Sequence, residues 1–111
     1  MLAHKVVLLD DAKEDLREIR RLAFEASGQR HTADAYLERI RKHLQALEHT
    51  AEAQPWFYFA DGTRSDYRFM PVERYVAFFT VDERTVRIKR ILPQRSNREA
   101  WLKRTSGHWE D

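Results

Sequence analysis

Residues 64–98 read RSDYRFMPVERYVAFFTVDERTVRIKRILPQRSNR, and this stretch decides the fold of the chain. It contains three runs rich in β-branched and aromatic residues, which predict three consecutive β-strands. These runs are Tyr67–Met70, Arg74–Val81 and Thr85–Leu92. Only residues 82–84 separate the second run from the third, so we expect a tight connection between these two strands.

The last of the three runs alternates between apolar and cationic residues. Successive side chains of a strand point to opposite faces, so the pattern predicts one apolar face and one cationic face. Val86, Ile88, Arg90 and Leu92 fall on one face, and Arg87, Lys89 and Ile91 on the other. Residues 84–98 contain six basic residues and no acidic one: Arg84, Arg87, Lys89, Arg90, Arg95 and Arg98. This local charge suits a polyanionic or acidic partner, although for any single residue a solvated strand face is the simpler interpretation.

Length and composition predict one globular domain spanning residues 1–111, with a polar tail over residues 105–111. The chain is 42% hydrophobic and 34% charged, and its net charge is only +2, so its basicity is a matter of placement. It contains no cysteine, which excludes disulfides and thiolate chemistry and fits a reducing compartment. The apolar run Val6–Leu9 is too short for a membrane span or a signal peptide, so we expect a soluble, cytoplasmic protein.

Two helices are predicted before the sheet. A short apolar strand, His4–Leu9, precedes Asp11 and Glu14, whose spacing is that of a capping box at a helix start. An apolar stripe then continues to Ser27, and Gly28 can adopt the left-handed conformation that ends helices. A second amphipathic helix is expected at about Thr32–Glu48, so the two form an antiparallel hairpin whose apolar stripes the sheet covers.

Three other features leave more than one interpretation. Phe24 lies off the apolar stripe of the first helix, and it is either a flank of the core or an exposed contact. The aromatic run Trp56–Phe59 is able to stack on bases if exposed, but it is more typical of core or of a strand start. Ser96 is a candidate cap for a short C-terminal helix that reaches Lys103 and packs Trp101 back on the domain.

Motifs for catalysis or metal binding are absent from the sequence. The five histidines show no metal-ligand spacing, and without cysteine a zinc site is not expected. The three glycines are scattered, so there is no phosphate-binding loop, and no nucleophile elbow occurs. Any chemistry would therefore use Arg, Lys or Tyr side chains over the sheet, as RNA cleavage can. We expect no cofactor, no metal and no small-molecule substrate.

The order of these elements resembles that of the RelE/ParE superfamily of type II toxin–antitoxin toxins. The stretches that carry the resemblance are DDAKEDLREIRRLAFEASG, ADAYLERIRKHLQALE, YRFMPVERYVAFFTV and TVRIKRILPQRSN, which together span almost all of residues 4–103. The resemblance implies an α+β fold: an N-terminal strand, an antiparallel helical hairpin packed on an antiparallel sheet of about four strands, and a short C-terminal helix. It also implies a growth-inhibiting toxin of a plasmid stabilisation-like system, with a cognate antitoxin as partner.

Two branches of this superfamily differ in their target. RelE-like toxins cleave mRNA on the ribosome and carry an Arg after a Tyr in the second long strand, where this chain has Val76 after Tyr75. ParE-like toxins bind DNA gyrase and trap it on cut DNA; their usual ending I-L-H-x-R-R-D is here I-L-P-Q-R-S-N, with Pro93 at the His position and Arg95 retained. The chain resembles the ParE branch more closely. A ribosome-dependent mRNA endonuclease is the alternative, and an inactive member that binds only its antitoxin is the third possibility.

The two active branches place different demands on the basic residues. For the endonuclease, the candidates that would ring a basic groove are Arg68, Lys89, Arg90 and Arg95. For a gyrase-binding toxin, the candidate target-binding residues are Arg87, Lys89, Arg95, Arg98 and Trp101. A structural role is an equal alternative for Arg90, which would then be half-buried and paired with Asp66 or Glu73. In either branch the antitoxin tail would fold over the hairpin and sheet and cover the basic face.

Overall fold

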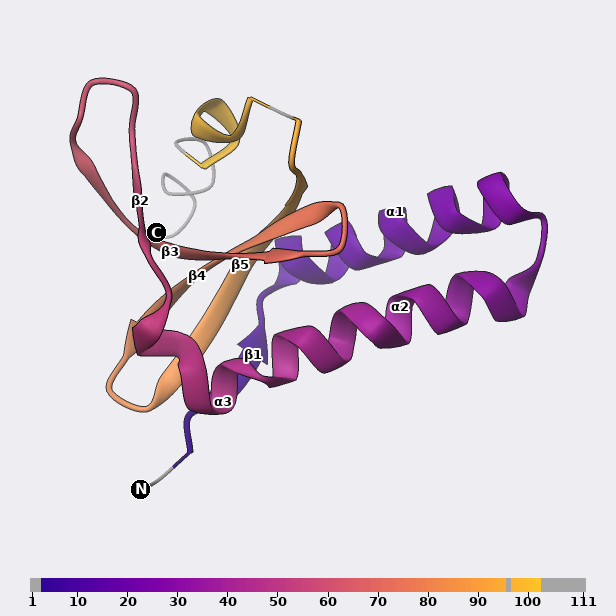
Figure 1. The fold of residues 1–111 in the computed structure, drawn as a ribbon, viewed down its shortest axis with the longest axis horizontal. Helices are drawn as coiled ribbons and strands as arrows, with labels where there is room; N and C mark the ends of the chain where they lie inside the picture. The colour runs from indigo at the N-terminus through magenta and orange to yellow at the C-terminus, as the bar shows by residue number, and fades with distance from the viewer. Residues whose placement is uncertain (1–2, 96, 103–111) are drawn as a thin grey trace.

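A computed structural model describes residues 3–95 and 97–102 of the chain (Figure 1). Two long helices form a hairpin beside a five-stranded sheet of order β1-β5-β4-β3-β2. The elements are β1 (Lys5–Leu8), α1 (Asp10–Ser27), α2 (Arg30–Gln45), α3 (Leu47–Thr50), the 3₁₀ turn η1 (Ala51–Ala53), β2 (Trp56–Tyr58), β3 (Arg64–Val72), β4 (Tyr75–Asp82) and β5 (Thr85–Pro93). Residues 98–102 are helical as well.

The sheet confirms the predicted α+β class. Strands β2 to β5 form an antiparallel meander, and the N-terminal strand β1 joins its edge by pairing parallel to β5. Parallel neighbours need a long crossover connection, and here the helical hairpin and the meander supply it. The three strands expected in residues 64–98 are all present, and Trp56–Tyr58 is a strand, as the interpretation of the aromatic run as a strand start anticipated.

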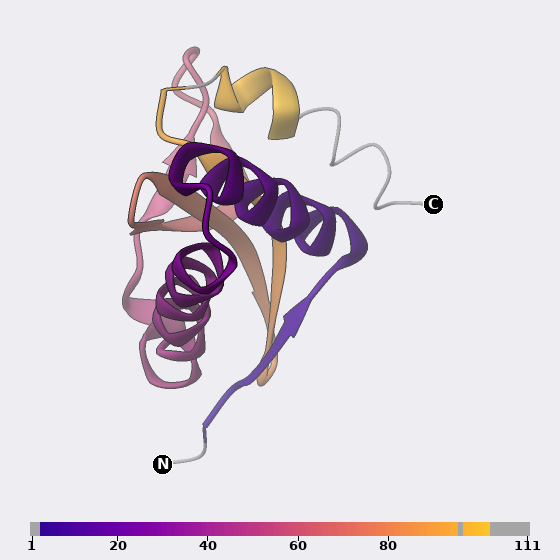
Figure 2. The same ribbon diagram turned by 90° about the vertical axis from the view of Figure 1, so that its right-hand side faces the viewer.

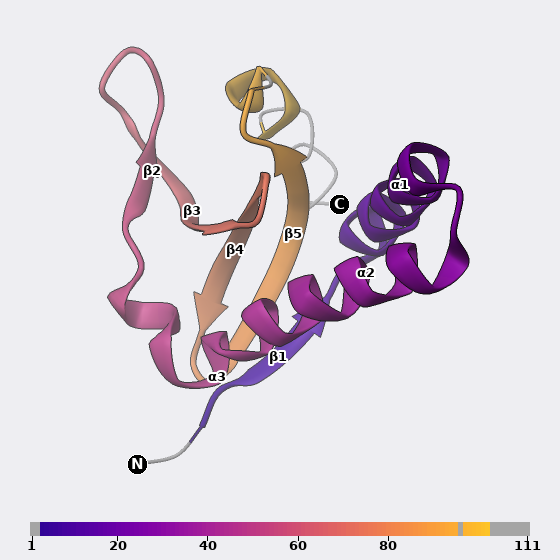
Figure 3. The same cartoon turned by 45° about the vertical axis from the view of Figure 1, so that its right-hand side comes forward.

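The sheet is covered on both faces, by two separate sets of apolar side chains. On one face, α1 and α2 bury Leu16, Ile19 and Ile40 against residues of β4 and β5 such as Phe79 and Ile88. On the other face, a smaller cluster gathers Tyr67, Val76, Phe78 and Leu92 around Leu102 of the C-terminal helix. Figures 2 and 3 show that helix (yellow) just beyond the end of β5.

Strand β5 contains a bulge that overturns part of the predicted alternation. Phe79 lies opposite Ile88, but the next partner, Phe78, lies opposite Arg90, so Lys89 is an extra residue in β5. A bulge of this kind shifts the side-chain parity of the residues beyond it. Ile91 therefore joins the helix-side core, and Leu92 joins the cluster on the other face. The expected division into one apolar and one cationic face holds only as far as Ile88.

The helix boundaries confirm one predicted signal and correct two others. Gly28 ends α1 with φ 70°, and its N–H donates to the Phe24 carbonyl at 2.7 Å. The capping box at Asp11 is wrong, because the N-cap is Leu9 and no side chain caps this helix start. The second helix begins at Arg30, two residues earlier than expected, and ends at Gln45. The short helix α3 follows from Leu47.

At the C-terminal end, Asn97 caps the helix: its side-chain oxygen accepts a hydrogen bond from the Ala100 N–H at 3.3 Å. The expected cap at Ser96, the end of this helix at Lys103 and the polar tail of residues 105–111 lie outside the described residues. No helix in the described part of the chain is both long enough and apolar enough to cross a membrane.

Candidate functional surfaces

The far end of the helical hairpin extends past the sheet (Figure 1). An apolar groove lies there between α1, α2 and the β3–β4 connection. The groove has a volume of about 650 Å³. It continues the apolar stripe of α1 beyond Ile19, where the sheet no longer covers it, so Leu22 stays 43% exposed. The other residues that line the groove include Ala23, Ala26, Ala35, Tyr36 and Tyr75. The exposed apolar side chains of this groove make it a candidate contact for a partner.

Cationic side chains lie at the rim of this groove. Arg39 and Arg74 both line it. The Arg39 guanidinium lies 5.2 Å from the centroid of the Tyr36 ring and 3.3 Å from the Glu73 carboxylate. Burial raises the pKa of the Tyr75 hydroxyl. The groove therefore combines an apolar floor with a positive edge, a combination that suits an acidic amphipathic helix.

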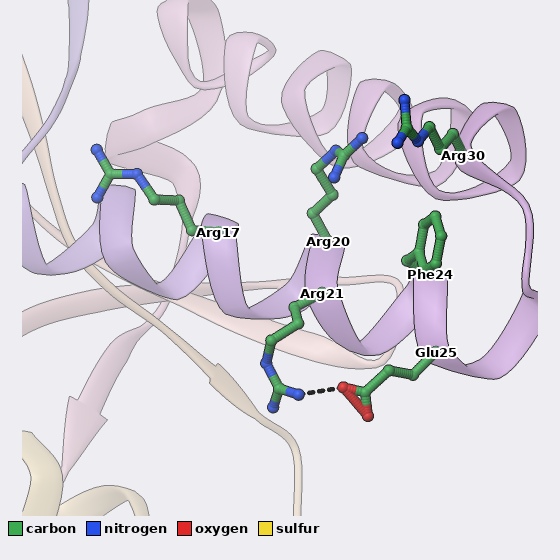
Figure 4. Close-up of a pocket in the computed structure, with 6 residues that line it drawn as sticks. All are labelled: Arg17, Arg20, Arg21, Phe24, Glu25 and Arg30. Carbon is green, nitrogen blue, oxygen red and sulfur yellow. Dashed lines mark hydrogen bonds and ion pairs between the residues drawn. The ribbon is translucent and has the colours of Figure 1, made fainter.

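The outer surface of the hairpin carries a second, smaller hollow of about 400 Å³ (Figure 4). Arg17, Arg20 and Arg30 line it together with Phe24, which is 36% exposed and therefore lies at the surface rather than in the core. Arg17 pairs with Glu14, and Arg20 pairs with Asp34 at 2.8 Å. These pairs largely balance the local charge. Because they are exposed, they contribute little to stability.

Arg90 is held by the first helix. Its guanidinium donates to the two carboxylate oxygens of Asp15 at 2.8 and 3.0 Å, and the Ile91 N–H donates to the same carboxylate at 2.8 Å. The hydrogen bonds to Asp15 raise the pKa of Arg90. Arg90 also lies 4.8 Å from the centroid of the Trp101 ring, so it joins α1, β5 and the C-terminal helix. The expected half-burial is correct, whereas the expected partners are wrong: neither Asp66 nor Glu73 holds this residue.

Lys89, the bulge residue of β5, is 3% exposed. Burial lowers the pKa of its amine to about 7, and the neighbouring charge of Arg87 contributes in the same direction. A side chain so deeply placed presents little of itself to a macromolecular partner. This placement is inconsistent with a role for Lys89 as a surface contact for either gyrase or RNA.

The four endonuclease candidates are not gathered around one groove. Arg90 is bound to α1 at one side of the sheet, and Lys89 is buried in β5. Arg68 lies on β3, two strands away, where it donates to the Gln54 carbonyl at 2.7 Å and stacks on Trp56. Arg95 is exposed in the turn after β5.

The gyrase-binding candidates other than Lys89 lie along β5 and the segment that follows it. Arg87 is partly exposed and has its guanidinium 3.5 Å from the Asp82 carboxylate. Arg95 is exposed, Arg98 is half-buried at the start of the C-terminal helix, and Trp101 is 37% exposed. These three residues lie within a few positions of one another in the segment that follows β5.

Sequence reasoning missed two participants in these arrangements. Asp15 holds Arg90 from 75 residues earlier in the chain, and no local pattern connects the two. Arg64 stacks on Trp56 together with Arg68, an arrangement that follows from the pairing of β2 with β3. Within residues 3–95 and 97–102, no group of three His, Cys, Asp or Glu side chains is placed to hold a metal ion.

Comparison with known proteins agrees with the geometry. A family model described as the ParE toxin of the type II toxin–antitoxin system, parDE, matches residues 6–98. Among solved structures, a chain of the "Chromosomal ParDE TA system from P. aeruginosa" is similar to this chain, with a TM-score of 0.68 and 18% identity over 82% of this chain and 96% of that chain. A comparison with curated protein sequences gives no significant match. Because the family model spans nearly the whole chain, the protein belongs to the ParE toxin family of the RelE/ParE superfamily and is a ParE-like toxin of a type II toxin–antitoxin system.

Proposed function

We propose that this toxin inhibits DNA gyrase by binding it, without catalysing a reaction of its own. Membership of the ParE family supports gyrase as the target. The observation that carries the proposal is the arrangement of the basic residues. Arg90 is fixed by Asp15 and Lys89 is buried, so two of the four candidates for RNA cleavage are engaged in the fold itself. Arginine and aromatic side chains remain exposed at the end of β5, and these residue types dominate binding hot spots.

The gyrase contact in this proposal is the segment after β5. Arg95 and Arg98 supply cations, and Trp101 supplies an anchor ring that remains 37% exposed. The Arg90 guanidinium stabilises the position of this ring through a cation–π contact. Leu102 is fully buried in the second core, so the helix that carries Trp101 is fixed to the sheet. A fixed anchor residue loses little entropy on binding.

We propose further that a cognate antitoxin occupies the groove beneath the hairpin. The similar ParDE structure is that of a toxin–antitoxin system. An amphipathic helix would bury its apolar side on Leu22 and Tyr36, and its acidic side would face Arg39 and Arg74 at the rim. Such a segment can be disordered when free and fold on binding.

A supercoiling assay with purified gyrase and relaxed plasmid tests this proposal. Added toxin should suppress supercoiling and accumulate linear DNA. The exposed Arg95→Glu variant should need at least about tenfold more protein for the same effect, as expected for a hot spot. Arg41→Glu on the exposed side of α2 is the matched control and should act like the wild type.

The same assay tests the role of the groove. Purified antitoxin should restore supercoiling to the wild type, whereas the Leu22→Asp variant should inhibit gyrase and resist the antitoxin, because a carboxylate enters an apolar contact. Unchanged supercoiling at every toxin concentration, together with cleavage of ribosome-bound mRNA in a translation extract, would establish the endonuclease alternative instead. Inactivity in both assays would identify a member that binds only its antitoxin.

A further inference from the structure

A stack of one indole and two guanidinium groups lies at the β2–β3 edge of the sheet. The guanidinium carbons of Arg64 and Arg68 lie 4.2 and 4.0 Å from the centroid of the Trp56 ring. Trp56 pairs with Arg68 across the two strands, so this contact is part of the strand register. Since both charges lie about 4 Å from one point, they are at most about twice that distance apart. Two cations are thus held close together on a rigid element.

These two cations are not neutralised by carboxylates. Within the described residues, neither Arg64 nor Arg68 forms an ion pair, and the one other partner of either is the Gln54 carbonyl, which accepts from Arg68 at 2.7 Å. The arginines of α1 differ in this respect, since Arg17, Arg20 and Arg21 all pair with acidic neighbours. The edge therefore presents its positive charge to an outside partner.

An exposed aromatic ring adjoins the stack. Tyr58 pairs with Arg64 across the strands and is 56% exposed, the highest exposure of any large hydrophobic residue in the described chain. Phe57, its neighbour in β2, packs instead into the second core. The strand thus divides its aromatic residues between the core and the surface.

We propose that this edge, defined by Trp56, Tyr58, Arg64 and Arg68, binds single-stranded DNA. The two guanidinium groups would contact neighbouring phosphates, and the Tyr58 ring would stack on an unpaired base. An acidic peptide would use the same cations, but only a nucleic acid offers a flat ring to Tyr58 at every residue beside its charges. The proposed contacts are to phosphates and to the face of a base, and neither depends on base identity, so binding is independent of sequence. The choice of DNA over RNA rests on the proposed function, since the proposed target holds cut DNA.

Asp61 and Glu99 lie at the β2–β3 turn, where they accept hydrogen bonds from the backbone N–H groups of Thr63 and Ala60. A further acidic residue lies within the edge itself. Asp66 is exposed and lies between the two arginines in β3. Its charge opposes that of a phosphate, so it weakens the attraction. Asp66→Asn should accordingly tighten DNA binding, in the opposite direction to the arginine variants.

Fluorescence anisotropy of labelled oligo(dT) with the purified toxin tests the inference without gyrase, so its failure is distinct from failure of the proposed function. Binding is measured over a series of salt concentrations. Arg64→Gln and Arg68→Gln should each reduce the slope of log K against log salt by about 0.7, the value for one phosphate contact on a single strand. Arg64→Lys should restore the slope.

Tyr58→Ala should weaken binding by about tenfold and leave the salt slope unchanged, because stacking does not release counterions. Arg41→Gln on α2 removes an equal charge elsewhere and should leave both quantities unchanged. Equal effects of Arg41→Gln and Arg64→Gln would overturn the inference, since net charge alone would then explain binding. Tighter binding of duplex DNA or of oligo(U) than of oligo(dT) would overturn it as well. Circular dichroism melting confirms that each variant is folded.

Discussion

Lys89 is an ionisable residue whose side chain is buried away from water. As the extra residue of the β5 bulge, it is buried in the sheet, and its amine has a pKa of about 7 mainly because burial disfavours the charged form. In the unfolded chain, a lysine has a pKa near 10.4. Between these two values the unfolded state binds a proton that the folded state does not bind. The free energy of unfolding therefore rises with pH across this window, and the full cost of the buried charge is present below about pH 7.

Replacement of Lys89 by Met, which has a similar length and no charge, should remove this dependence. The quantity to compare is the free energy of unfolding of Lys89→Met minus that of the wild type. This difference should be largest, in favour of the variant, below about pH 7. It should then fall by up to about 1.4 kcal/mol per pH unit as the pH rises towards 10. Urea unfolding at about pH 6, 7.5 and 9 measures it. Lys13→Met, an exposed site on α1, should differ from the wild type by the same amount at each pH. A Lys89→Met difference that is equally independent of pH would contradict a buried, neutral amine.

Residue-level prediction from the sequence succeeded where the cause was local. Gly28 was identified as a helix end because its conformation follows from the missing side chain. Half-burial was one of two equal interpretations of Arg90 and is the one observed, but its partner Asp15 was not identified, since the contact depends on how α1 packs beside β5. The burial of Lys89 was not predicted, because it follows from the bulge in β5, which only the pairing with β4 establishes.

Helix α1 and strand β5 are joined at the point where β1 ends. The Leu9 N–H donates to the Ile88 carbonyl at 3.0 Å, and further along β5 the Asp15 carboxylate accepts from Ile91 in place of a strand partner. The side chains of Asp15 and Arg90 are only 15% and 13% exposed. Loss of the carboxylate would leave a buried cation and a buried N–H without their acceptor.

Asp15→Ala should therefore lower the free energy of unfolding by about 3–5 kcal/mol, the cost typical of breaking a buried ion pair from one side. Asp34→Ala removes the exposed partner of Arg20 and should cost no more than about 1 kcal/mol. The double variant Asp15→Ala/Arg90→Met should recover part of the loss, because no buried cation is then left unpaired. Chemical denaturation of the three variants measures the effect. Equal losses for Asp15→Ala and Asp34→Ala would show that the pair does not join the two elements.

At the level of elements, periodicity predicted both long helices, all three strands of residues 64–98 and the hairpin. These elements follow from patterns within short windows of sequence. The predicted assignment of side chains to the two faces of β5 was wrong beyond Ile88. The sheet is buried on both faces, so Ile91 and Leu92 both pack in apolar surroundings. Two adjacent apolar residues after two adjacent cations are compatible with either register, and only the pairing with β4 distinguishes them.

In the whole molecule, the hairpin is longer than the sheet it covers. The same apolar stripe of α1 forms core near the sheet and an open groove beyond it, which places the proposed antitoxin site at Leu22 and Tyr36. The proposed gyrase contact lies on the segment after β5, and the proposed DNA contact lies at the β2–β3 edge. The sequence predicted the basic residues of that segment, but the groove depends on relative element lengths that no local pattern contains.

The measurement that tests the central claim most directly is pulse incorporation of labelled thymidine and labelled methionine. Both are measured in the first minutes after the chain is induced in cells without its antitoxin. A gyrase-directed toxin should reduce thymidine incorporation first, while methionine incorporation continues. An earlier fall in methionine incorporation would contradict the account and identify the ribosome as the target.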